Sequence, residues 1–278
     1  MSAKDDAWSK LLEIPKLQSW LHDEKSLVYQ VMSGDIKRVG ARPVDIIPAY
    51  GRSDLPVVLL EKGLELLRNR YGGCLLIKVK EGRLPTLFPS LPEPESKYTG
   101  PPFRPIPRQT VITDPDSDIM NEETGIHLGW SMGVFQSFFI ELFSPFEEFS
   151  FGGRLKRAAK GRFRISQEEF EVHTQLEADA YFESDERIIV MEAKKTDYAH
   201  PLTDFSLHQI LLPLILVGSI SEKPSSAVLF DFSGRRSEDI SDFLFRLYHI
   251  QVLGDGATIL PFEYRITRSK EYRISIRC

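Results

Sequence analysis

The stretch 175–195, QLEADAYFESDERIIVMEAKK, reads as two short strands joined by a polar turn at 184–186. A two-stranded antiparallel hairpin centred on this turn places Asp179 directly opposite Glu192. Side chains alternate between the two faces of a strand, so both carboxylates are expected to project from the same side. The stretch therefore predicts a hairpin that brings two acidic side chains together.

This acidic pair predicts a metal site. Opposed Cβ atoms lie roughly 4.5–5.5 Å apart, and two carboxylates at that distance repel each other unless a cation lies between them. Hard oxygen ligands favour Mg²⁺. The same register places Glu177 opposite Lys194, on the same face. A lysine two residues beyond Glu192 is positioned to hold an attacking water or a phosphate, which is the chemistry of metal-assisted phosphodiester hydrolysis.

The alternative interpretation is a solvated hairpin on which Glu177 and Lys194 form an ordinary cross-strand ion pair. The second strand weighs against this alternative, because 188–191 and Ala193 are apolar, as in a strand buried on both faces. Charged groups at the end of a buried strand carry a desolvation cost that structural residues seldom justify. The residues thus favour the metal site.

The same residues resemble the PD-(D/E)XK nuclease signature, and further elements resemble one group of type II restriction endonucleases. The resemblance covers about residues 120–218, with a fainter echo at 34–60, and Ala178 stands where the signature has proline. Five elements follow in order at sensible spacing: Gly161-Arg162, Glu177-Ala178-Asp179, IIVMEAK ending at Lys194, Asp204-Phe205, and Gln209 with Pro213.

The resemblance implies an α/β fold with a restriction-endonuclease-like core, in which helices flank a mixed central sheet. It implies Mg²⁺-dependent cleavage of double-stranded DNA at a specific short site, as part of restriction–modification. Because duplex cleavage needs two cuts, a homodimer is the expected assembly. No nucleotide cofactor and no membrane are expected.

The resemblance also implies the roles of individual residues. Asp179 and Glu192 are the expected metal ligands, and the Ala193 carbonyl is a further candidate. Lys194 is expected to orient the attacking water and to stabilise developing charge. Second-tier catalytic candidates, for orienting that lysine and for positioning the strand or the water, are Glu177 and Gln209.

Composition fits this class of protein. The chain has 278 residues, a net charge of −5 and two cysteines, Cys74 and Cys278, which excludes a disulfide framework and fits a reducing cytoplasm. No apolar run approaches the ~20 residues of a membrane span, and the N-terminus has no secretory h-region.

Positive charge is concentrated just before the hairpin despite the acidic total. The run 153–164, GRLKRAAKGRFR, contains no acid. A charge run is usually a solvated face, but here a DNA backbone would have to pass, so phosphate contacts are the competing interpretation. The candidate DNA-binding residues are Arg154, Lys156, Arg157, Lys160, Arg162 and Arg164.

Three regions are expected along the chain. Residues 1–84 form an N-terminal module for DNA recognition or dimer contacts, with two amphipathic helices over 6–32. Residues 85–115 hold nine prolines and are expected to form an extended connection. Residues 116–278 are the expected nuclease domain.

Several local elements are predicted. Helices are expected at 55–73, ending at Gly72-Gly73, and at 237–253; strands are expected at 74–80 and 226–233, with an edge hairpin at 261–278. Asn121 is the expected N-cap of a long apolar helix over 122–143. Glu122 or Glu123 at its start is either an extra site carboxylate or a dipole-favoured acid.

Other chemistries have little support. The sequence has no phosphate-binding glycine motif and no G-x-S-x-G motif. Its six histidines form no H-x-H or H-E-x-x-H pattern, so each is more readily structural than a zinc ligand. The remaining alternatives are another nuclease on this fold, acting in repair, as a resolvase or as a phage exonuclease, and a non-catalytic DNA-binding protein.

Overall fold

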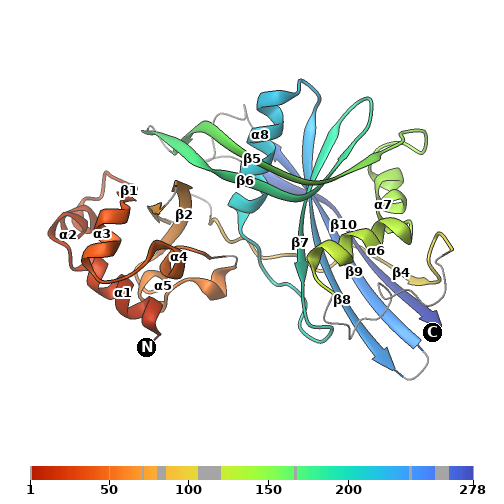
Figure 1. Cartoon of the computed structure of the whole chain (residues 1–278), viewed down its shortest axis with the longest axis horizontal. Coiled ribbons are helices and arrows are strands. Elements are labelled where there is room, and N and C mark those ends of the chain that lie inside the picture. Colours follow the sequence, from red (N-terminus) through yellow and green to blue (C-terminus); the bar gives the residue numbers. More distant parts are fainter. Residues whose placement is uncertain are drawn as a thin grey trace.

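The computed structural model shows a mixed α/β protein (Figure 1). Among the described residues, no helix is both long and apolar enough to cross a membrane. The structure describes residues 2–49, 51–70, 72–79, 86–105, 120–165, 168–237, 240–253 and 263–277.

The N-terminal module combines short helices with a small antiparallel sheet of order β1-β3-β2. Ser2 caps the first helix, where its side chain accepts the N–H of Asp5. The elements are α1 (Ala3–Leu12), α2 (Pro15–His22), β1 (Val28–Val31), α3 (Ser33–Arg38), α4 (Pro43–Ile46), a 3-10 turn (Arg52–Asp54), α5 (Val57–Leu60), β2 (Leu64–Arg70) and β3 (Gly73–Lys78).

The predicted helix at 55–73 is wrong for most of its length. Only 57–60 is helical. The chain continues as β2, and β3 then runs back along β2 to form a hairpin. Gly72 lies in the connecting turn with φ +69°, so it serves a strand turn and not a helix end. The strand predicted at 74–80 is confirmed as β3, and β1 replaces the end of the second helix predicted within 6–32.

The C-terminal part is a mixed sheet with helices on both faces, which confirms the predicted fold class. The strand order is β6-β7-β8-β9-β10-β4, with β5 on the other edge of β6; β7–β8 and β10–β4 are parallel. The elements are β4 (Ser96–Gly100), α6 (Glu122–Ser131), α7 (Val134–Leu142), β5 (Ser150–Ile165), β6 (Glu168–Glu183), β7 (Ile188–Lys195), α8 (Leu207–Ile220), β8 (Ser225–Ser237), β9 (Ile240–Leu253) and β10 (Glu263–Arg277).

Two buried clusters lie on opposite faces of this sheet. Phe182, Met191 and Phe230 pack with α6 and α7 on one face, whereas Val190 and Leu229 pack with α8 on the other. The second cluster continues into the N-terminal module, and a bridge between Arg70 and His173 joins the small sheet to β6. Figure 1 shows the β5–β6 ribbon reaching from the large sheet toward the N-terminal strands.

Three further predictions need correction or refinement. The final helix at 237–253 is wrong, because β9 occupies this segment and is buried on both faces, so its apolar residues show no alternation. The edge hairpin at 261–278 is also wrong, because β10 is one long strand between β9 and β4. The helix over 122–143 breaks at Gly133, with φ +76°.

The described part of the proline-rich segment contributes to the sheet. Residues 96–100 form β4 at the edge, where prolines on either side cost no ladder hydrogen bonds. Leu87 and Phe88 are buried in this segment. Residues 106–115 of the predicted connection lie outside the described residues.

Candidate active site

The β6–β7 hairpin has the predicted register. Ala180 faces Met191, and the ladder continues to Glu183 and Ile188 beside the turn. The β6–β7 ladder ends at the Ala180–Met191 pair, so Asp179 and Glu192 lie just beyond it. The two strands thus begin to separate where the predicted site residues start.

A bulge in β6 coincides with this point. Gly153 pairs with Tyr181 and Leu155 with Ala178, so β6 has one residue more than β5 in this interval. As a consequence Ala178 joins the cluster under α8, whereas Ala180 joins the cluster under α6 and α7. Because of the bulge, side chains two residues apart on either side of Asp179 point to opposite faces of the sheet.

Asp179 is fixed by the neighbouring strand. Its Oδ2 accepts the backbone N–H of Ala193 at 2.9 Å. This hydrogen bond ties the acidic end of β6 to the end of β7 after the ladder has stopped, and it holds the carboxylate beside Glu192 and Lys194.

Glu192, Lys194 and Glu122 form a compact charged group. Lys194 Nζ donates to Glu192 Oε1 at 2.7 Å and lies 3.7 Å from Glu122 Oε1. The side chains of Glu192 and Lys194 are 10% and 19% exposed. The structure therefore brings the predicted Asp179, Glu192 and Lys194 together and adds a carboxylate from α6.

The start of α6 is attached to β7, which explains the position of Glu122. Lys195 Nζ donates to the carbonyl of Met120 at 2.6 Å, and Asn121 caps the helix by accepting the N–H of Thr124 at 2.9 Å. The predicted N-cap is confirmed. Of the two acids considered, Glu122 is the one that reaches Lys194.

Two carboxylates of this group, Glu192 and Glu122, have raised pKa values. Burial raises the pKa of Glu192 to about 8; Lys194 opposes this change, and Asp179 and Glu122 add to it. Burial also raises the pKa of Glu122. Burial would lower the pKa of Lys194, but Glu192 and Glu122 outweigh it, so its pKa is raised. In the metal-free protein these raised pKa values favour the protonated forms of Glu192 and Glu122.

A cavity of about 250 Å³ opens beside Asp179. It lies between the first turns of α6 and the strands β5 and β6, and its lining includes Glu122, His127, Phe151 and Arg154. Asp179 and Glu122 are therefore accessible from the side of α6.

Glu177 is predicted to lie opposite Lys194, but the β6–β7 ladder ends at Ala180 and Met191, before it reaches these residues. Glu177 contacts Arg154 Nη2 at 2.6 Å and Lys156 Nζ at 2.8 Å, both on β5. The physical reason is the bulge, which turns the preceding part of β6 toward its β5 neighbour, where Lys156 is the ladder partner of Glu177. The hydrogen bond from Lys156 and the charge of Arg154 lower the pKa of Glu177.

The basic run therefore lies along the edge strand β5. The side chains of Arg157, Lys160, Arg162 and Arg164 lie outside the described residues, although their backbone is in β5. In the β5–β6 register the backbone of Arg162 pairs with Glu171 and that of Arg164 with Glu169. This register places acids opposite part of the run.

Gln209 and its neighbour His208 lie in the first turn of α8, the helix that packs on β6, β7 and β8. Burial lowers the pKa of His208 to about 4, with smaller contributions from the positive charges of Arg68 and Lys194. His208 therefore stays neutral beside the site. The sequence places His208 among the histidines that are more readily structural, and its burial agrees with that interpretation, whereas nothing in the sequence links Arg68 on β2 to the first turn of α8.

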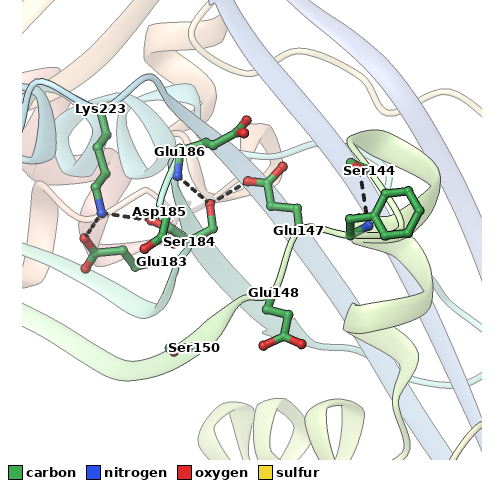
Figure 2. A pocket seen from close by; sticks show the side chains of 10 residues that line it. Ser144, Glu147, Glu148, Ser150, Glu183, Ser184, Asp185, Glu186 and Lys223 are labelled. Carbon is green, nitrogen blue, oxygen red and sulfur yellow. Dashed lines mark hydrogen bonds and ion pairs between the residues drawn. The ribbon is translucent and has the colours of Figure 1, made fainter.

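A larger cavity, of about 650 Å³, lies at the opposite end of the hairpin (Figure 2). Its lining includes the turn residues Ser184 and Asp185, with Glu183 paired to Lys223 at 2.6 Å. Its lining does not include Asp179, Glu192 or Lys194. Although this cavity is the larger of the two, it is therefore not part of the candidate active site.

The donor set fits Mg²⁺. Asp179 and Glu192 offer hard oxygen atoms, and burial, which is the main cause of the raised pKa of Glu192, makes its charged form costly unless a cation binds it. Across the described ranges, no three or more His, Cys, Asp or Glu side chains form a ready-made metal site. Two carboxylates completed by water and substrate oxygens are a usual protein environment for this ion.

The chain belongs to the DUF6997 family, a domain of unknown function whose family model matches residues 89–251. The matched segment is more than half of the chain and contains the hairpin, the start of α6 and the first turn of α8. No curated protein and no solved structure shows significant similarity.

Proposed function

We propose that this protein is a Mg²⁺-dependent type II restriction endonuclease of the PD-(D/E)XK kind, which hydrolyses phosphodiester bonds of double-stranded DNA at a specific short site. The supporting observation is the group formed by Asp179, Glu192, Lys194 and Glu122 at the end of the β6–β7 ladder. Two carboxylates beside a largely buried lysine suit the hydrolysis of a phosphodiester.

The residues of this group have different roles in the proposed reaction. Asp179 and Glu192 would hold the ion, and the Ala193 N–H keeps Asp179 in place. When bound, Mg²⁺ would supply positive charge and lower the pKa of a water molecule. Lys194, kept protonated by its acidic neighbours, orients the attacking water and stabilises charge that develops on the phosphate.

The assembly follows from the reaction. A duplex has two strands, and one such group cuts one strand at a time. A two-fold symmetric homodimer presents two groups to the two strands, and we propose this assembly for the cytoplasmic enzyme.

Digestion of a defined plasmid tests the proposal, with Mg²⁺ in one sample and EDTA in the other, followed by sequencing of the ends. Discrete fragments with constant ends, formed only with Mg²⁺, are expected. A smear, a ladder or resection from ends would indicate another nuclease on this fold. Binding without cleavage under any divalent ion would indicate a non-catalytic DNA-binding protein.

A further inference from the structure

One carboxylate holds two cations at the edge of the large sheet. Glu177 Oε2 lies 2.6 Å from Arg154 Nη2, and Glu177 Oε1 lies 2.8 Å from Lys156 Nζ. The side chains of Arg154 and Lys156 are 57% and 52% exposed, and that of Glu177 is 34% exposed. Each oxygen of Glu177 thus contacts a cation that solvent still reaches, and one negative charge is shared between two positive ones.

The three residues adjoin the candidate active site. Glu177 precedes Asp179 by two positions on β6, across the bulge. Arg154 lines the cavity that also contains Asp179 and Glu122. A phosphate next to the scissile bond would therefore meet Arg154 first, with Lys156 two positions farther along the same strand.

The chemistry of the contact resembles phosphate binding. Arginine and lysine donate the same charge-assisted hydrogen bonds to carboxylate and to phosphate oxygens. Exposed ion pairs contribute little to stability, so an incoming polyanion can replace one at small cost. Arginine has five N–H donors and lysine three, so a phosphodiester can bind the free donors, but it receives the full positive charge of both side chains only after the carboxylate has released them.

We propose that Glu177 is an internal competitor of the phosphate backbone, holding Arg154 and Lys156 in the free protein and yielding them to duplex DNA. The identity of the partner rests on the proposed function. The role replaces the predicted one of orienting Lys194 and makes Glu177 a residue that limits affinity.

Glu177→Gln tests the proposal in binding titrations of a labelled duplex across a salt series in EDTA, where no cleavage occurs. Affinity is expected to rise several-fold at ~0.1 M salt. The slope of log affinity against log salt should steepen by up to about 0.9, since the substitution removes one negative charge and each neutralised phosphate contributes roughly 0.9. In an Arg154→Ala/Lys156→Ala background, Glu177→Gln should no longer change affinity.

Glu183→Gln is the matched control. It makes the same change on the same strand, and Glu183 is also paired with a lysine, Lys223, at 2.6 Å (Figure 2). It lies six residues farther along β6, or about 20 Å at the strand rise. Its duplex affinity and salt slope should match those of the wild type.

Unchanged or weaker duplex binding by a folded Glu177→Gln protein, including no binding by either protein, overturns the proposal. Tightening confined to single-stranded DNA also overturns it. The plasmid assay separates this result from the proposed function. If the wild type cleaves the plasmid but Glu177→Gln binds duplex DNA no more tightly, only the proposed competitor role of Glu177 is wrong. If Glu177→Gln binds more tightly but the wild type does not cleave, only the proposed nuclease activity is wrong.

Discussion

Asp179 Oδ2 accepts the backbone N–H of Ala193 at 2.9 Å, immediately beyond the last ladder pair of β6 and β7. The Asp179 carboxylate thus provides a link between the two strands at a point where their backbone pairing has stopped. The two strands can therefore separate while their ends stay in register. This arrangement leaves room for Glu122 to approach Lys194 from α6.

Asp179→Ala, Glu192→Ala and Lys194→Ala should each abolish cleavage and leave duplex binding intact. These groups act on the ion and the attacking water, so their loss should cost several kcal/mol of transition-state stabilisation. Single-turnover cleavage and binding titrations measure the two effects. His200→Ala is the control: its side chain is 85% exposed, and its activity should stay within about tenfold of wild type. Near-normal turnover by any of the three folded alanine variants would contradict its role.

Glu122→Gln should lower the cleavage rate by roughly 10–100-fold, or about 1.4–2.7 kcal/mol. Its carboxylate lies 3.7 Å from Lys194 Nζ and adds to the charge that an ion would neutralise. Glu123→Gln is the matched control, because Glu123 is the next residue on the same helix and is exposed. Equal effects of the two substitutions on the rate would show that only the charge at the helix start matters.

The sequence could predict the hairpin register because the turn and the buried strand constrain each other. The positions of Ala180 opposite Met191 and of the Asn121 cap followed from local patterns alone. The sequence could not predict the partner of Glu177, because the choice of partner depends on a one-residue bulge of β6 against β5. A bulge changes which face a side chain occupies and leaves no apolar signal.

The errors in secondary structure have a common physical cause. The segments 64–70 and 240–253 are strands that bury residues on both faces, so their apolar spacing also fits a helix. Sequence reasoning likewise could not decide whether Glu122 or Glu123 reaches the site. The contact between Lys195 and the carbonyl of Met120 helps to fix the rotation of α6 over the site.

Gly125→Ala should destabilise the fold by about 1–3 kcal/mol, as overpacking commonly does. A Cβ at this position would lie 2.3 Å from the ring of Phe232, so α6 must move away from β8. Because α6 carries Glu122, the rate of cleavage should fall as well. Gly218→Ala in α8 is the control: a Cβ there meets nothing within 4 Å, and helix propensity favours alanine. Chemical denaturation of both variants measures the difference; equal stabilities would contradict the close approach.

The stability of the metal-free protein should fall as the pH rises from about 4.5 to about 8. Folding raises the pKa of Glu192 from 4.5 to about 8, so the folded protein retains a proton that the unfolded chain has released. A tenfold difference in acidity between the folded and unfolded states corresponds to about 1.4 kcal/mol, so this carboxyl group accounts for a decline of up to a few kcal/mol.

Glu192→Gln removes this titration, so its advantage in free energy of unfolding over wild type should grow between pH 5 and about pH 8.5 in EDTA. Denaturant titrations of both proteins across this range measure the difference. Mg²⁺ at pH 8 should reverse it, because an ion that binds the ionised carboxylate stabilises the wild type alone. A difference that stays constant with pH would mean that Glu192 is already ionised in the free protein. Lys194 would then neutralise it without any need for a metal ion.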